Sequence, residues 1–181
     1  MIRSENPFRR GTRLAACVLA TTALLSCADT AAPTSHALLH GDLVMSSADI
    51  DPGLVAEVHA ATSRFHTTVQ ATKAGYAIGS PCIAHPTLGA MGFHWVNGAL
   101  VDPVFNPREP EALVYGPDGK LGAVEYIVIN VGQPAPTFAG HPFDVGGTPV
   151  PVAHWSLHVW THRTNPSGIF SPWNPAIVCP T

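Results

Sequence analysis

The residues best suited to chemistry are isolated polar side chains within apolar, strand-like runs. His94 stands in the run MGFHWVN at residues 91–97, and Glu125 stands in VEYIVI at residues 124–129. A buried carboxylate is costly unless it is paired or binds a cation. A third run, residues 152–161, carries His154 and His158 on one face of a predicted strand, opposite an apolar face.

Histidine and carboxylate side chains that converge from three strands form a metal site. Neighbouring strands lie about 4.8 Å apart, so one ligand from each can reach a common ion. His94, Glu125 and either His154 or His158 would form a two-histidine, one-carboxylate set, which suits Fe(II), Zn, Mn or Cu. The two last histidines cannot both ligate one ion, because residues four apart on a strand are separated by about 13 Å. His141, in an aperiodic stretch, could complete or cover the site.

A polar network without metal is the alternative interpretation, in which Glu125 accepts hydrogen bonds from a histidine or tyrosine. The chain has no HxH, HExxH or HxxxD motif that would support the metal independently. It also lacks a G-x-S-x-G nucleophile motif, a phosphate loop and a dinucleotide fingerprint, which argues against a serine hydrolase or nucleotide enzyme. Aromatic residues on a curved sheet could instead line the pocket of a non-enzymatic module that binds a small ligand.

The elements that must position these residues are mainly strands. Strands are predicted at residues 91–97, 112–115, 121–131 and 152–161, with a hairpin turn at residues 117–120. One helix is predicted over residues 52–73, with Asp51 as its N-cap, an apolar stripe, and Gly75 as its stop. Residues 132–150 have no period and are predicted to form a long loop. The predicted fold class is α+β, with one N-terminal helix packed on a curved, barrel-like antiparallel sheet that a disulfide closes.

The first 26 residues are predicted to be a lipoprotein signal peptide. Four arginines precede an apolar run at residues 14–25, which is too short to span a bilayer but fits a signal-peptide core. The run ends in Leu24-Leu25-Ser26-Cys27, which resembles the lipobox of bacterial lipoproteins. This predicts export and a lipid anchor on Cys27, at the periplasmic or outer face of the cell envelope. Secretion with cleavage a few residues later is the alternative.

The predicted mature chain consists of a flexible tether at residues 27–50 and one globular domain at residues 51–181. It retains five basic and eleven acidic residues, a formal net charge of −6. An acidic chain with few basic residues lacks the basic surface that binding to nucleic acid or to an anionic membrane requires. The expected partners are therefore the membrane, through the lipidated Cys27 only, and a small-molecule ligand.

Two cysteines remain after Cys27, and they stand near the two ends of the predicted domain. Cys82 and Cys179 are expected to form a disulfide, because an oxidising compartment usually pairs such cysteines. Two free thiols or metal ligands are the alternative, which the absence of a CxxC motif disfavours.

A series of short motifs resembles a family of uncharacterised secreted bacterial proteins. The family pattern reads GMGxHYVN, PExLLY, VEY, LHVW, NPxG and NPxxxC, and the similarity spans about residues 55–180. In this chain the motifs are residues 91–97, 110–115, 124–126, 157–160, 165–168 and 174–179, with Trp95 where the pattern has tyrosine. The resemblance implies a compact secreted domain and no established activity. It includes His94, Glu125 and His158 but not His154, which favours His158 as the third ligand.

Overall fold

The computed structural model describes residues 50–181, and the predicted signal peptide, Cys27 and the tether up to residue 49 lie outside the described residues. Two helices open this part of the chain, α1 (Pro52–Thr62) and α2 (Thr68–Lys73), with a 3-10 turn at Ser63–Phe65 between them. Asp51 caps α1 as predicted, since its carboxylate accepts a hydrogen bond from the Gly53 amide at 2.8 Å. Among these residues no helix is both long and apolar enough to cross a membrane.

The prediction of a single helix over residues 52–73 is wrong, because the α-helix is interrupted after Thr62. The Tyr115 hydroxyl lies 2.7 Å from the Phe65 carbonyl and 3.3 Å from the Thr67 carbonyl, which an unbroken helix would use internally. The break changes the phase of the apolar stripe. Val58 and Phe65 are buried, but Val69 is 60% exposed. The predicted stop is confirmed, because Gly75 has a φ of 92° directly after α2.

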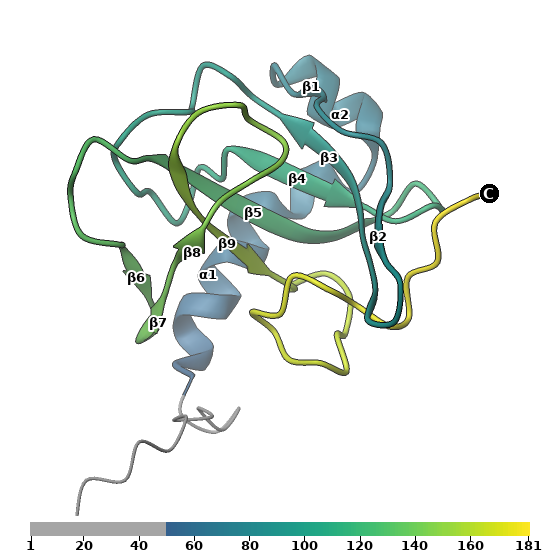
Figure 1. Ribbon diagram of the computed structural model, residues 1–181. Helices are drawn as coiled ribbons and strands as arrows, with labels where there is room; N and C mark the ends of the chain where they lie inside the picture. Colours follow the sequence, from purple (N-terminus) through teal and green to yellow (C-terminus); the bar gives the residue numbers. More distant parts are fainter. Residues whose placement is uncertain (1–49) are drawn as a thin grey trace, which may run out of the picture. The chain divides into compact units, whose positions relative to one another are not determined.

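The sheet is antiparallel and has seven strands in the order β1-β3-β4-β5-β9-β8, with β2 also paired to β3. The four predicted strands are confirmed as β3 (Gly89–Val96), β4 (Ala112–Tyr115), β5 (Leu121–Ile129) and β9 (His154–Val159). The shorter strands β1 (Ala77–Ile78), β2 (Ile83–His85) and β8 (Asp144–Val145) were not predicted. A separate two-stranded sheet pairs β6 (Thr137–Phe138) with β7 (His141–Pro142) inside the predicted long loop. Figure 1 shows these strands and the helices behind them.

The expected sheet is curved and barrel-like, but the observed sheet does not close into a barrel. Along the path of strands, β1 and β8 are the two ends, and the strand pairing within residues 50–181 does not join them. Strand β8 has only two residues and pairs with β9 through Asp144 and Val145. A strand this short cannot continue the ladder far enough to close it. The sheet therefore stays open.

The two faces of the sheet have different coverings. One core cluster joins Val58, Phe65 and Ala71 of the helical segment with alternate sheet residues such as Leu113 and Tyr126. The opposite face carries a smaller cluster, in which sheet side chains meet the C-terminal segment: Ala90, Val114, Ala123, Trp160 and Ile177. By the alternation of side chains along strands, His94, Glu125 and His158 belong to this second face.

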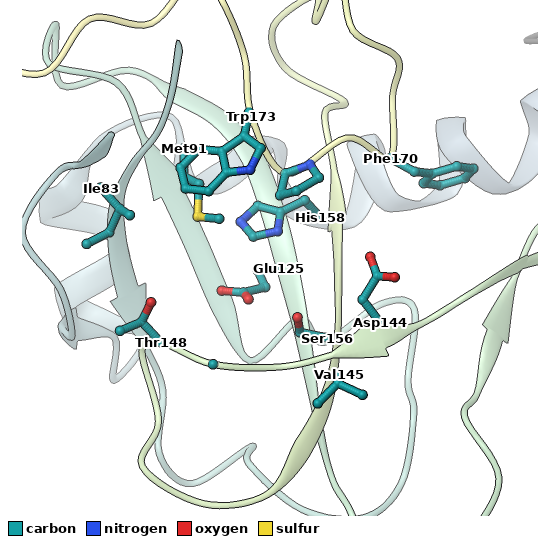
Figure 2. Close-up of a pocket in the computed structure, with 12 residues that line it drawn as sticks. Ile83, Met91, Glu125, Asp144, Val145, Thr148, Ser156, His158, Phe170 and Trp173 are labelled. Atoms are coloured by element: carbon teal, nitrogen blue, oxygen red, sulfur yellow. The ribbon is translucent and has the colours of Figure 1, made fainter. Parts of the chain in front are cut away.

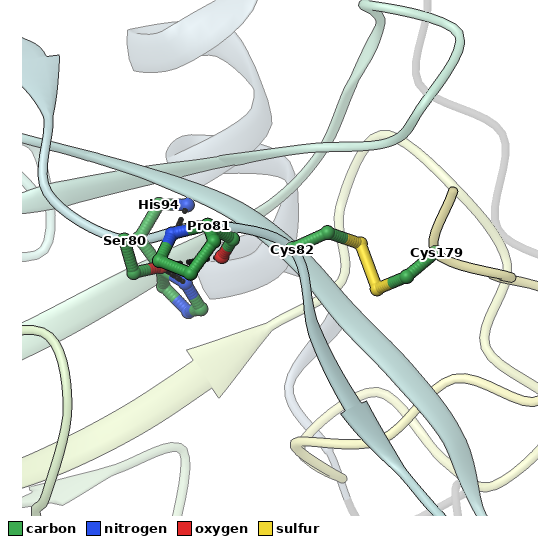
Figure 3. Close-up of a disulfide and its surroundings, with 5 residues drawn as sticks. All are labelled: Ser80, Pro81, Cys82, His94 and Cys179. Carbon is green, nitrogen blue, oxygen red and sulfur yellow. Dashed lines mark hydrogen bonds between the residues drawn. A yellow bond between two sulfur atoms is a disulfide. The ribbon is translucent and has the colours of Figure 1, made fainter. Parts of the chain in front are cut away.

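The predicted disulfide between Cys82 and Cys179 is present and joins residues 97 positions apart (Figure 3). It holds the C-terminal segment to the connection between β1 and β2. Asn174 adds a backbone bridge to Ala90 of β3. The C-terminal segment is thus fixed over the face of the sheet that holds the three ligand candidates.

Candidate metal centre

His94, Glu125 and His158 come together in the buried interior, and this group could bind a metal ion. Glu125 of β5 pairs directly with His158 of β9. His94 Nε2 lies 3.2 Å from His158 Nε2 and 3.4 Å from Glu125 Oε2. One ligand atom from each residue lies within 4.8 Å of the others. The three residues are 0%, 1% and 4% exposed, respectively.

The three ligand-bearing strands are not all neighbours, because β4 lies between β3 and β5. In the register, His94 pairs with Val114 of β4, and Ala112 of β4 pairs with Glu125. Two strand spacings are about 9.6 Å, a distance that two long side chains can close from either side. The small side chain of Ala112, fully buried on the same face, leaves room for them above β4.

Ser80 fixes the tautomer of His94. The Ser80 Oγ lies 2.9 Å from the Pro81 carbonyl oxygen and 2.8 Å from His94 Nδ1 (Figure 3). A carbonyl oxygen only accepts, so the hydroxyl donates to Pro81, and the His94 Nδ1–H must donate to the hydroxyl oxygen. His94 therefore presents the lone pair of Nε2 toward Glu125 and His158. This second hydrogen bond is the kind that orients metal-binding histidines.

Burial controls the charge of all three groups. It lowers the pKa of His94 to about 4, and burial together with His94 lowers the pKa of His158 well below its ordinary value. Burial also raises the pKa of Glu125 well above its ordinary value, against the lowering effect of a hydrogen bond from the Ser156 hydroxyl. The histidines are thus neutral, and each neutral imidazole has one unprotonated nitrogen that can act as a ligand. A bound cation would favour the carboxylate over the neutral acid.

The arrangement fits a transition-metal ion by two tests. Ligand atoms about 2.0–2.1 Å from a tetrahedral ion are separated by about 3.3 Å. The His94–His158 and His94–Glu125 pairs, at 3.2 Å and 3.4 Å, are close to this spacing, and the Glu125–His158 pair lies within 4.8 Å. In addition, Glu125 Oε2 is buried and has no hydrogen-bond partner. Buried polar atoms are rarely left without a partner, and a cation would supply one. Two imidazoles and a carboxylate are a donor set typical of Zn and of non-haem Fe(II).

A pocket of about 330 Å³ opens beside the group, and Glu125 and His158 line it. Figure 2 shows these two residues at its centre, with Met91 and Trp173 on one side and Asp144 on the other. A metal held by three protein ligands keeps open positions, and catalytic metal sites differ from structural ones in this way. A ligand in the pocket would lie next to such open positions.

The remaining histidines lie elsewhere. His154 is buried with its Nδ1 2.6 Å from the Val152 carbonyl, and it does not join the group. The strand spacing predicted that only one of His154 and His158 would do so. His141 also stays outside, and its ring stacks on Phe170 at 4.7 Å. His162 contacts the Thr62 hydroxyl of α1 through Nε2 at 2.8 Å.

Sequence reasoning missed the polar residues that surround the three ligands. No sequence motif includes Ser80 or Ser156. Ser156 shares the predicted strand face of His158, however, and could have been predicted to lie near the site on that ground. Asp144 lies in the stretch predicted to be a loop, where no periodicity assigns a face. The expected aromatic lining is represented by Trp173, and Phe170 lines the pocket on the side of Asp144 (Figure 2).

Comparison with protein-family models, with curated proteins and with solved structures finds no match for the chain. The resemblance to a family of secreted bacterial proteins therefore stays a prediction. The chemistry of the site is argued from its geometry alone.

Proposed function

We propose that this domain binds a divalent transition-metal ion through His94, Glu125 and His158 and uses the open positions of that ion to act on a small molecule in the adjacent pocket. The observation that carries the proposal is the buried triad itself, in which His94 Nε2 lies at about the spacing of a tetrahedral ion's ligands from both His158 Nε2 and Glu125 Oε2. When bound, the ion supplies Lewis acidity: it polarises an oxygen-containing ligand or lowers the pKa of a bound water. The donor set suits Zn, Fe, Mn or Cu.

The chain's own residues have separable roles in this proposal. Ser80 orients His94 through the hydrogen bond at Nδ1, and Ser156 lines the pocket together with Glu125. The burial of the three ligands reduces competition by bulk water for the open positions. The pocket supplies the space in which a ligand can reach the ion.

Elemental analysis of the purified residues 27–181 tests the metal proposal. We expect about one equivalent of a transition metal in the wild type and less than a tenth of that in His94→Ala. Glu125→Gln is nearly isosteric and serves as a second variant should His94→Ala fail to fold. His66→Ala changes an exposed histidine and is the control. Equal metal content in wild type, His94→Ala and Glu125→Gln would contradict the proposal.

A non-enzymatic small-ligand module is the second candidate function. It is favoured by the pocket itself, which at about 330 Å³ falls within the size range of small-molecule sites. The two functions differ in their dependence on the triad. A ligand that co-purifies with the wild type and equally with Glu125→Gln supports the module, and loss of the ligand together with the metal supports the metal-dependent function.

We also propose that the domain is exported and anchored through a lipid on Cys27. The sequence of residues 1–27 supports this, and the Cys82–Cys179 disulfide is of a kind that persists in oxidising compartments. The test is fractionation of cells that express the full chain. We expect the wild type in the membrane fraction and Cys27→Ala in the soluble fraction. Equal distribution of both would exclude the anchor.

A further inference from the structure

The pocket beside the triad has a pronounced charge pattern. Twelve residues line it, all in the described part of the chain, and none of them is lysine or arginine. Asp144 is exposed on its wall and takes part in none of the ion pairs between residues 50–181. A carboxylate without a cationic partner in a pocket repels anions and favours a positively charged or hydrogen-donating group.

The other side of the pocket is aromatic and apolar. Trp173 and Met91 lie together on the side away from Asp144, with Ile83 beyond them (Figure 2). The indole ring attracts cations through its electron-rich face and also packs against apolar groups. One wall therefore suits the apolar body of a ligand, and the opposite wall suits a cationic group.

From this pattern we propose that the pocket binds a small organic amine in its protonated form, with the ammonium group toward Asp144 and the apolar body against Trp173. The inference deepens the proposed function by naming the ligand class, and it rests on that function only for the role of the metal. The volume of about 330 Å³ limits the ligand to a small molecule. Asp144 is the specificity-determining residue, because it is the acidic pocket residue outside the triad.

A matched set of three probes tests the ligand class: 2-phenylethylamine, 2-phenylethanol and phenylacetate, which share a ring and differ in charge. Binding is measured by calorimetry on residues 27–181, both stripped with a chelator and loaded with zinc. In the stripped protein we expect 2-phenylethylamine to bind at least tenfold more tightly than either other probe. In the stripped protein no ion is present to bind the carboxylate of phenylacetate, so the measured affinities reflect the pocket side chains alone.

Two variants test whether Asp144 and Trp173 are responsible for the preference for the amine. Asp144→Asn should weaken the binding of 2-phenylethylamine at least fivefold and leave the binding of 2-phenylethanol unchanged. Trp173→Ala should weaken the binding of both probes to the same extent. Asp102→Asn changes an exposed aspartate outside the pocket and is the control. Phenylacetate binding as tight as the amine in the stripped wild type, or an amine preference that survives in Asp144→Asn, would overturn the inference. Absence of metal in the elemental analysis would remove the proposed function while leaving this result intact.

Discussion

Two hydrogen bonds of one serine decide what His94 can do. With its hydroxyl proton directed to the Pro81 carbonyl, Ser80 can only accept from His94, and this leaves Nε2 free for the site. The reverse tautomer would place a proton between Nε2 and the other two ligands and would block a metal. The orientation of the ring is thus set from outside the triad.

Replacement of Ser80 by alanine should therefore weaken metal binding without unfolding the domain. Loss of a hydrogen bond that orients a ligand typically reduces metal affinity about 10–100-fold. We expect a decrease of this size for Ser80→Ala in competition titrations of zinc against a chromogenic chelator. Ser63→Ala, at an exposed position in the turn after α1, should match the wild type. An affinity within twofold of the wild type in Ser80→Ala would show that the tautomer is fixed by other means.

Glu111 is a buried carboxyl group outside the triad, and its titration should make the stability of the domain depend on pH. Burial raises its pKa to about 8, although its Oε2 accepts a hydrogen bond from the Ile127 amide at 2.9 Å. The folded state then holds a proton that the unfolded state loses above its ordinary pKa of 4.5. Stability is therefore lost as the pH rises from about 4.5 to about 8.

Glu111→Gln removes this loss while it keeps an acceptor for Ile127. Each unit of pKa difference corresponds to about 1.4 kcal/mol. We expect the variant and the wild type to be similar at pH 5 and the variant to be more stable by at least about 2 kcal/mol at pH 8. Urea unfolding of the chelator-treated proteins at both pH values measures this. A difference that does not change with pH would mean that Glu111 is already ionised in the folded state.

At the scale of elements, strand β3 carries His94 next to a backbone constraint. Gly92 has a φ of 116°, and a Cβ built on it would lie 2.5 Å from the Tyr115 carbonyl oxygen of β4. Only glycine avoids both the strain and the clash. The close approach of β3 to β4 thus depends on the residue two positions before His94.

Gly92→Ala should accordingly destabilise the domain, by about 1–3 kcal/mol from the backbone conformation alone. Gly98→Ala is a matched control on the same segment, because a Cβ there meets no atom within 4 Å and the φ is ordinary. We expect the control to lie within about 0.5 kcal/mol of the wild type in urea unfolding. Zinc affinity should fall only in Gly92→Ala, because the register of β3 positions His94. Equal stability of the two variants would contradict this account of β3.

Two members of the triad were predictable from the sequence because a polar residue stands out within an apolar, strand-like run, whereas the choice of His158 over His154 rested on the motif resemblance. His94 and Glu125 stand out in this way without any knowledge of strand order. The interposition of β4 was not predictable, because strand order depends on pairing between distant segments. The break after Thr62 also escaped prediction, since it depends on the hydroxyl of Tyr115, which is 50 residues away from Phe65 in the chain. Local patterns identify faces, and tertiary hydrogen bonds decide where elements end.

On the scale of the whole molecule, two long-range features hold the second face of the sheet together. The disulfide joins Cys82 to Cys179, and the proposed metal would join β3, β5 and β9. They act on different parts of the chain. The bridge restrains the unfolded chain over 97 residues, whereas the triad is aligned by the register of β5 with β9 and of β3 with β4.

This separation predicts that the two contributions are independent. Replacing both cysteines by serine should lower the free energy of unfolding by about 2–5 kcal/mol, because the loop-closure restraint is lost. Zinc at about 100 times its Kd should still stabilise the double variant by about 2.7 kcal/mol, the same increment as in the wild type. Glu125→Gln should keep the disulfide contribution and lose the zinc increment. Urea unfolding of the three proteins with and without zinc measures both quantities. Loss of the zinc increment in the double serine variant would instead mean that the bridge positions the triad, through Ser80 and Pro81.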